Sequence, residues 1–509
     1  MPSSLRPWRV HASARHALAL ALACALGLAA ALHAVPAAAQ NAGLLARPDA
    51  HGRIGYEQIE LPGKERLGLV GTSYLVDVPF LPGVSLGPAV YGAIRGQRGG
   101  FFTIGGEAAW RQQMWGPLGV ELGVYAGGGG GGGAPQGGGL MLRPHADLLW
   151  DFGPLAVGLS LSRVRFPNGQ IDSTQFGVVV NAINDFRYVP ADRIGTPLRG
   201  GGRAGFGFDR VQFVVGDYHT RTGTLIGGGP LPRDIGYVGV RAEQAFTQTA
   251  YWGLEANGAA QSGVAGYAEY LGTLGYETEL VRNRINVGAR IALGMGGGGA
   301  IPTAGGLLAK AAVYGVVRLS PELGLALEAG LTDAPRGTFR AAHASASLVW
   351  ALDGPSTPSA PARPTRTEFS GGVEHFNALR KDGSTRGLTA DALKVSRYLT
   401  SNLYFTGQVH SAMVGGAGGY SAAVLGAGWR QPIGDRLHVG AELLGGASGG
   451  GGVDSHGMIV QPMAYVGYQL TPSLALRVGA GAVRSVRGNL SSPLVDVSLV
   501  VSYGVSAGS

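Results

Sequence analysis

The chain has 509 residues, of which 90 are glycine and one is cysteine, and its formal net charge is +8. The glycine share is more than twice the usual value of about 7%, but it has no Gly-X-Y period, which excludes collagen, and it disfavours a helix-rich enzyme. With 45% apolar and only 14% charged residues, the chain is too apolar for a disordered protein. Extended, strand-rich structure is the remaining expectation.

The first segment, residues 1–39, has the features of a secretory signal peptide. Three arginines precede an apolar run from Ala17 to Ala31, and small residues end at Ala39, as a signal peptidase requires. The run is short for a transmembrane helix, and no stop-transfer pattern follows it. Cys24 lies inside this segment, so the mature chain has no thiol for a disulfide, a nucleophile or a metal site. We expect Sec export with cleavage near Ala39.

The mature chain repeats one set of landmarks three times. Pro154, Pro321 and Pro472 each lie in a short turn between two apolar runs, at intervals of 167 and 151 residues. Trp110-Arg111-Gln112 recurs as Trp429-Arg430-Gln431, whereas the middle copy has no such triplet near Tyr276. Such self-similarity indicates one structural unit used repeatedly. The predicted units are residues 40–184, 204–352 and 368–509, separated by irregular linkers at 185–203 and 353–367, the second of which is rich in Pro and Ser.

Each unit divides into about eight segments in which apolar and small or polar residues alternate, the period that is typical of β-strands. In the segment that follows Ser473, Leu474, Leu476 and Val478 share an apolar face. Tight connections alternate with longer ones, as expected for outer-membrane strands with short turns at one end and loops at the other. In the third unit the segments begin near Glu368, Leu388, Leu403, Tyr420, Leu437, Met458, Leu474 and Leu494.

Aromatic residues lie on the apolar face near the short-turn end, where a girdle at a membrane interface would place them. Glycine runs at 127–133 and 296–299 lie in the longer connections, and we expect them to be mobile tips of outer loops. The predicted girdle residues are Trp110, Trp150, Trp350, Trp429, Tyr468 and Tyr503.

The signal, the mature chain without cysteine, the alternating segments, the turn asymmetry and the girdle together resemble Gram-negative outer-membrane β-barrel proteins, over essentially the whole mature chain. The resemblance is to a class and names no single family. It implies an all-β, transmembrane antiparallel up-and-down β-barrel fold with about 24 strands in the bacterial outer membrane. It also implies outer-membrane lipid, lipopolysaccharide and the barrel assembly machinery as partners. Barrels of this class commonly end on an aromatic residue. This chain departs from that pattern, because Ser506-Ala507-Gly508-Ser509 follow its last aromatic residue.

The 24 strands can close either as one wide barrel or as three barrels of eight, because strand number sets the diameter. The usual single barrel per envelope chain favours the first closure, and the irregular linkers and bulky inward residues favour the second. A wide barrel predicts a porin-like or export channel for an unknown solute. Three small barrels filled by their own side chains predict a non-conducting structural or adhesion protein that displays glycine-rich loops.

Charged residues of mixed sign on the inward face are the candidate functional residues. In a pore they tune solute selectivity, whereas in a closed barrel they are salt-bridged filling. We find no catalytic motif, phosphate-binding loop, metal-ligand spacing or basic block, so we expect no enzymatic activity, cofactor, metal or nucleic acid, and the oligomeric state stays open. The predicted interior residues are Glu121, Arg143, His145, Asp147, Arg290, Lys310, Arg318, Glu328, His438, Glu442, Arg477 and Asp496.

Overall fold

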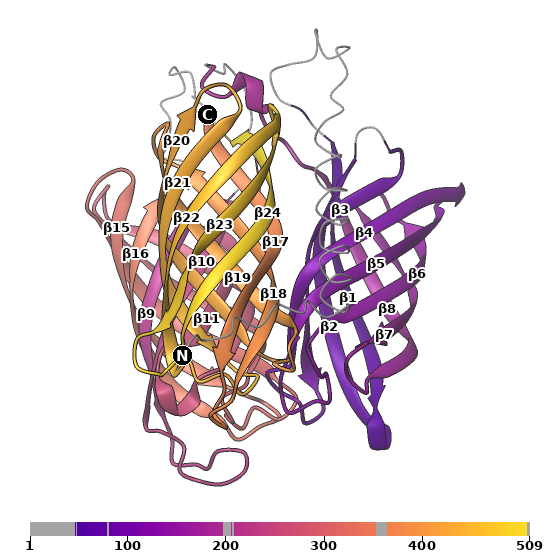
Figure 1. Ribbon diagram of the computed structural model, residues 1–509, viewed down its shortest axis with the longest axis vertical. Helices are drawn as coiled ribbons and strands as arrows, with labels where there is room; N and C mark the ends of the chain where they lie inside the picture. The colour runs from indigo at the N-terminus through magenta and orange to yellow at the C-terminus, as the bar shows by residue number, and fades with distance from the viewer. Residues whose placement is uncertain are drawn as a thin grey trace, which may run out of the picture.

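The computed structural model describes residues 46, 48–78, 81–196, 205, 208–352 and 364–505. In these ranges 24 β-strands form three closed barrels of eight antiparallel strands each (Figure 1). The structure therefore selects three small barrels over one wide barrel. The predicted signal segment, its cleavage site and residues 506–509 lie outside the described residues. Among the described residues, no helix is long and apolar enough to span a membrane.

Barrel 1 follows the simplest topology, in which each strand pairs with the next and the last strand returns to the first. The closing pair is β1 with β8, where Gly55 faces Val179. The strands are β1 (Asp49–Leu61), β2 (Glu65–Asp77), β3 (Val84–Arg95), β4 (Phe102–Trp115), β5 (Leu118–Gly130), β6 (Met141–Asp151), β7 (Leu155–Arg165) and β8 (Asp172–Asp185).

Barrel 2 repeats this topology and closes between β9 and β16, where Gly216 faces Ser345. The strands are β9 (Arg210–Thr220), β10 (Asp234–Ala245), β11 (Ala250–Ala259), β12 (Ala268–Val281), β13 (Ile285–Gly297), β14 (Leu307–Arg318), β15 (Leu323–Asp333) and β16 (Arg340–Ala351).

Barrel 3 closes between β17 and β24, where Val373 faces Val497. All eight of its strands begin within three residues of the positions predicted from alternation. The strands are β17 (Thr365–Leu379), β18 (Thr385–Tyr398), β19 (Leu403–Val414), β20 (Ser421–Ile433), β21 (Leu437–Gly449), β22 (Gly457–Thr471), β23 (Leu474–Ser485) and β24 (Ser491–Val505). Three short 3-10 turns, η2 (Pro62–Lys64), η3 (Ala191–Arg193) and η4 (Ser262–Val264), complete the described elements.

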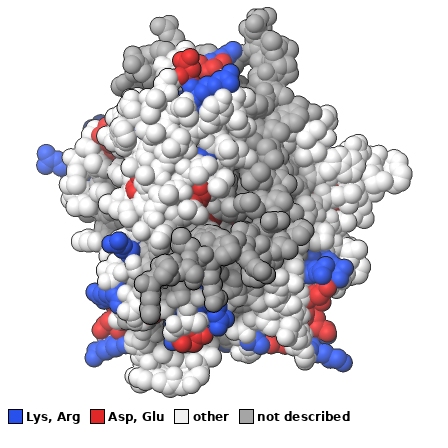
Figure 2. All heavy atoms as spheres, in the orientation of Figure 1, with Lys and Arg blue, Asp and Glu red and all other residues white. Residues whose placement is uncertain are grey.

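The alternation in sequence becomes an apolar outside and a polar inside. On β7, Leu159 points outward and is 60% exposed, whereas its neighbours Ser160 and Ser162 point inward and are buried. On the face drawn in Figure 2, charged side chains gather mostly toward the two ends of the molecule, and uncharged side chains cover much of the described surface between them. An exposed apolar belt of this kind is what lipid tails, rather than water, would cover.

The two ends of the barrels differ, as predicted. In barrel 3 the connections at one end, residues 399–402, 434–436 and 472–473, are short. The connections at the other end, such as 415–420 and 450–456, are longer and lie at the lower end in Figure 1. We call these the turn end and the loop end.

At the loop end the three barrels meet through glycine-rich backbone. The contacts run in a cycle, because the β3–β4 loop of barrel 1 meets barrel 2, its counterpart in barrel 2 meets barrel 3, and its counterpart in barrel 3 returns to barrel 1. Backbone hydrogen bonds join the barrels, for example Gly99 N to Ala304 O at 2.6 Å and Gly418 N to Gly137 O at 3.0 Å. Glycines also lie against one another across each contact, namely Gly100 with Gly298, Gly266 with Gly450, and Gly419 with Gly131.

The structure corrects the prediction for part of the two glycine runs. Gly127, Gly128, Gly129 and Gly130 are the last residues of β5 and are buried, and Gly297 ends β13 and is buried as well. The sequence pattern predicted that these glycines lie at loop tips, because glycine is common in turns. Gly128 and Gly297 lie where two barrels approach closely, because an added Cβ would meet the backbone of Ser411 in barrel 3 and of Gly100 in barrel 1. The remaining glycines of the runs, at 131–133 and 298–299, lie in the connections that follow β5 and β13.

Candidate functional site: the barrel interiors

The interior of barrel 1 contains a network of ion pairs. Arg143 on β6 donates two hydrogen bonds to Glu57 on β1, with Nε–Oε1 at 2.8 Å and Nη2–Oε2 at 2.9 Å. Arg53 on β1 donates from Nη2 to Oδ2 of Asp147 on β6 at 2.8 Å. All four side chains are at most 5% exposed. Charges buried to this degree are tolerated only when they are paired, so these contacts hold opposite walls of the barrel together.

His145 lies between two carboxylates of the same network. Its Nδ1 is 3.2 Å from Asp147 Oδ1, and its Nε2 is 3.1 Å from Glu107 Oε1. An ionised carboxylate can only accept a hydrogen bond, so the geometry fits a doubly protonated, cationic imidazole ring. The ring then offsets part of the negative charge in the interior.

Glu121, His145 and Asp147 also lie close enough to offer ligand atoms to one metal ion, within 4.8 Å of one another. The guanidinium of Arg53 lies beside these three residues, since it bonds to Asp147 and its Nε lies 3.7 Å from Glu121 Oε1. A cation is therefore already present beside these carboxylates. The donor set fits this arginine better than it fits an added metal ion.

Barrel 2 has a denser network centred on two glutamates. Arg290 on β13 bonds to Glu328 on β15, with Nε–Oε2 at 2.7 Å, and also contacts Glu255 on β11. Lys310 on β14 bonds to Glu255, with Nζ–Oε1 at 3.2 Å, and contacts Glu269 on β12. Each of these side chains is at most 3% exposed. Five neighbouring strands are thus cross-linked through one chain of charges.

In barrel 3 the network converges on Glu442 of β21. Arg477 on β23 donates from Nη1 to Glu442 Oε1 at 2.9 Å, Tyr404 on β19 donates to the same oxygen at 2.8 Å, and Lys394 on β18 pairs with the other oxygen. The aromatic ring of Tyr465 covers the Arg477 guanidinium at 4.6 Å. Lys394, Glu442 and Arg477 thus each have a partner of opposite sign.

Eleven of the twelve predicted interior residues are buried inside the barrels, with at most 7% exposed, and His438 and Asp496 are among them. Arg318 is the exception and corrects the prediction. It has the inward parity of β14, but it is the last residue of that strand, its side chain is 42% exposed, and it lies 3.7 Å from Glu279 at the turn end. The alternation of residues predicts which face of a strand a side chain lies on. It does not predict whether that position is inside the barrel or beyond its end.

Several central partners were missed in the sequence, notably Arg53, Glu57, Glu107, Glu255 and Glu269. The signal that could have found Glu255 is present, since it alternates with the outward Leu254. On β1 the signal is weaker, because the outward face there is less apolar. The alternating pattern also does not predict which inward charged side chains form ion pairs across the barrel interior.

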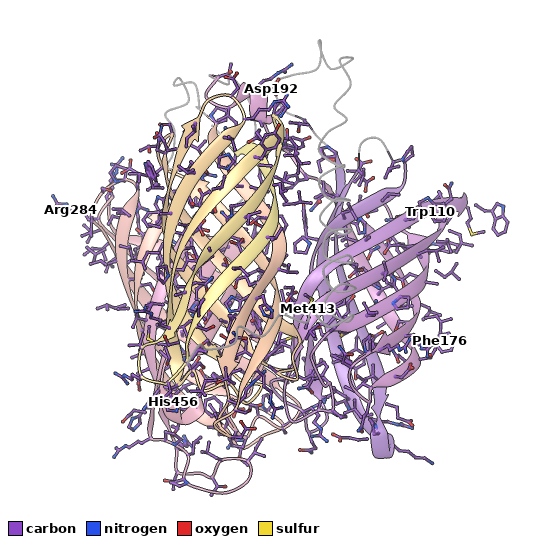
Figure 3. All side chains as sticks on the ribbon, in the orientation of Figure 1. Trp110, Phe176, Asp192, Arg284, Met413 and His456 are labelled. Atoms are coloured by element: carbon purple, nitrogen blue, oxygen red, sulfur yellow. The ribbon has the colours of Figure 1, made fainter. Side chains whose placement is uncertain are left out.

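Four of the predicted girdle residues are exposed on the outer face. Trp110 is 39% exposed, Trp150 50%, and Trp429 and Tyr468 are each 42% exposed. Trp110 points away from barrel 1 near the turn end of β4 (Figure 3). Aromatic side chains in this position suit the boundary between lipid and water.

The other two girdle residues lie between barrels. Trp350 of barrel 2 packs against Phe405 of barrel 3, with ring centroids 5.5 Å apart. Tyr503 is 4% exposed and packs against Phe186, at 5.7 Å, and Tyr188. The prediction of a lipid-facing girdle is therefore wrong for Tyr503, because the segment that leaves barrel 1 covers it.

Apolar side chains close each interior at the loop end. In barrel 1 Phe101 and Phe166 meet edge to face with centroids 5.8 Å apart, and both are at most 2% exposed. Equivalent loop residues are buried in the other two barrels. We call these three clusters the loop-end lids. They are formed by Phe101, Phe166 and Ile171 in barrel 1, Tyr267, Ile301 and Phe339 in barrel 2, and Tyr420, Val453 and Leu490 in barrel 3.

Closed antiparallel up-and-down barrels with an apolar outside and a charged inside define the class of transmembrane β-barrels. No protein-family model and no curated protein matches the sequence. Among solved structures, OpdO of Pseudomonas aeruginosa is 11% identical over 90% of this chain and 97% of its own, with a TM-score of 0.22. The siderophore receptor PirA of Acinetobacter baumannii is 11% identical over 89% and 80%, with a TM-score of 0.28. Superpositions at these TM-scores carry no argument about function, which depends on the barrels themselves.

Proposed function

We propose that the chain is an outer-membrane protein whose three barrels are closed to solutes, and that its role is structural or adhesive rather than conductive. The observation that carries the proposal is the filling of the interiors. Arg290, Glu255 and Glu328 cross the lumen of barrel 2 and are at most 3% exposed. A conducting pore needs charges that face water, and here they face one another.

The loop-end lids support the same proposal. An ion that entered from the loop end would first have to displace buried aromatic rings, for example Phe101, and then separate a buried ion pair. Each step is costly, because packed interiors leave few voids as large as a water molecule and an unpaired buried charge costs several kcal/mol. Barrels of eight strands are in general just wide enough for their own side chains.

The proposed location follows from the signal segment together with the exposed apolar belt. Outer-membrane lipid and lipopolysaccharide would cover the belt, and the barrel assembly machinery would insert the chain. The surface left for a partner is then the loop end, where three copies of the same lid lie side by side. An enzymatic role has no support in the interior, where the charges are held in pairs.

Planar-bilayer recording tests the proposal. The mature protein, refolded in detergent and checked for heat-modifiable gel mobility, is expected to add no stepwise current, whereas a general porin refolded in the same way gives large steps. Reproducible steps from the folded protein would contradict the proposal and favour the channel function. In that case Arg477→Glu should alter ion selectivity if barrel 3 contains the path.

A further inference from the structure

The outer surface of barrel 2 carries a furrow of about 630 Å³ across strands β12 to β15. Ala289, Ala311 and Ala329 form its floor, and Ile291 and Val313 stand beside it. Ile291 is 62% exposed and Val313 is 64% exposed, so the walls project into the surroundings of the barrel. We call this depression the outer furrow.

The strand register explains its shape. Ala289 lies opposite Val313, and Ile291 lies opposite Ala311, so a small residue faces a large one in two successive cross-strand pairs. On the outer face the alanines are therefore diagonal neighbours and make a continuous channel between the larger side chains.

The furrow belongs to barrel 2 in particular. The position of Ala289 corresponds to Leu122 in barrel 1, 167 residues earlier, where the larger side chain fills the space and is 47% exposed. In barrel 3 the corresponding Ala441 faces another alanine, Ala464, on β22 and Trp429 on β20, so the position that Val313 holds beside Ala289 is taken by a small residue. The same barrel fold therefore tolerates either a large side chain that fills this position, as in barrel 1, or an alanine that leaves it open, as in barrel 2.

Positive charge lies at the turn end of the same strands. Arg282 and Arg284 are in the β12–β13 turn and Arg318 ends β14, while Glu279 and Glu322 are the acidic residues nearby in the chain. Only Arg318 has an ion pair, a long one of 3.7 Å to Glu279, so within the described ranges Arg282 and Arg284 have no anionic partner. Arg284 projects away from the barrel (Figure 3).

We propose that the outer furrow and these arginines together bind one glycerophospholipid, with its phosphate at Arg282 and Arg284 and one acyl chain in the furrow. The inference rests on the proposed function, because it requires barrel 2 to lie in a bilayer. Ala289 is five residues from Arg284, about 16 Å along a strand, which matches half of a hydrocarbon core of about 30 Å. Basic side chains attract anionic headgroups, and a chain in a furrow gains van der Waals contacts that a flat surface lacks.

Native mass spectrometry of the full-length mature protein tests the site. After removal of co-purified lipid, the protein in detergent is mixed with phosphatidylglycerol or with the diacylglycerol that has the same chains but no phosphate. One phosphatidylglycerol per chain is expected to survive release from the micelle, with at least about fivefold less retention of the diacylglycerol. Ala289→Leu, which installs the residue of barrel 1, should reduce retention about threefold or more, and Arg284→Gln about fivefold.

Two matched variants control for general effects. Ala441→Leu and Arg436→Gln change the corresponding positions of barrel 3 and should leave retention unchanged. The proposal would be overturned if Ala289→Leu and Ala441→Leu retained lipid equally or if the two lipids bound equally. It would also be overturned if the furrow retained only detergent, or if a protein dimer formed in place of the lipid adduct. Failure of the proposed function is distinguishable, because a chain that does not lie in a bilayer would not become heat-modifiable in phosphatidylglycerol vesicles, and a conducting barrel would give stepwise current in the planar bilayer.

Discussion

Replacing Arg290 with methionine is expected to destabilise barrel 2 by about 3–5 kcal/mol, the usual cost of removing one partner from a buried ion pair. Arg290 bonds to Glu328 and contacts Glu255, so the variant leaves two carboxylates in the interior without their main counter-charge. Chemical denaturation of the refolded protein in detergent measures the loss, and hydrogen exchange in strands β11 to β15 shows whether it falls in barrel 2.

An exposed pair in the same barrel provides the control. Arg340 donates to Asp333 at 2.8 Å, but its side chain is 59% exposed, so Arg340→Met should cost less than about 1 kcal/mol. If Arg290→Met cost no more than Arg340→Met, water would have to screen the interior charges. That result would contradict the sealed barrel and restore the channel function.

Replacing Gly100 with alanine is expected to open the contact between barrels 1 and 2 and to cost more than about 3 kcal/mol. The residue has φ +86°, and an added Cβ would lie 2.1 Å from the backbone nitrogen of Gly298. Neither backbone can give way without breaking neighbouring strand pairs, so overpacking adds to the conformational strain. Denaturation measures the total, and hydrogen exchange of residues 297–306 reports the separation of the barrels.

The substitution Gly153→Ala is the control that separates the cost of backbone strain from the cost of the contact between barrels. It has φ +91°, nearly the same conformation, but nothing lies within 4 Å of its added Cβ. Gly153→Ala should therefore cost only the left-handed strain of about 1–2 kcal/mol and leave exchange at 297–306 unchanged. Equal effects of the two substitutions would show that the glycine junction does not hold the barrels together.

The junction gives a physical reason for part of the glycine content. Each barrel presents equivalent glycines to the next, and the cycle of contacts closes after the third barrel. A single chain thus has the arrangement of a ring of three units, held by backbone approach at the loop end and by aromatic contacts such as Trp350 with Phe405. Sealed interiors and a rigid ring are both consistent with a structural role.

The local structure could be predicted from the alternation of residues along the chain. A strand of an antiparallel barrel has one face toward lipid and one toward the interior, so alternation in the chain predicts the strands and their faces directly. This is why the strands of barrel 3 start within three residues of the predicted positions, why the turn and loop ends differ, and why residues such as Glu442 and Lys310 were predicted to point inward.

Contacts between strands that are far apart in the chain could not be predicted in this way. Alternation is the same for one ring of 24 strands and three rings of eight, because closure depends on which distant edges meet, such as β1 with β8. It also could not pair Arg53 with Asp147, show that Arg318 lies beyond the interior, or show that Tyr503 and the glycines that end β5 are buried. Periodicity reports the environment on each side of one strand, whereas partners and closure are set by residues far away in the chain.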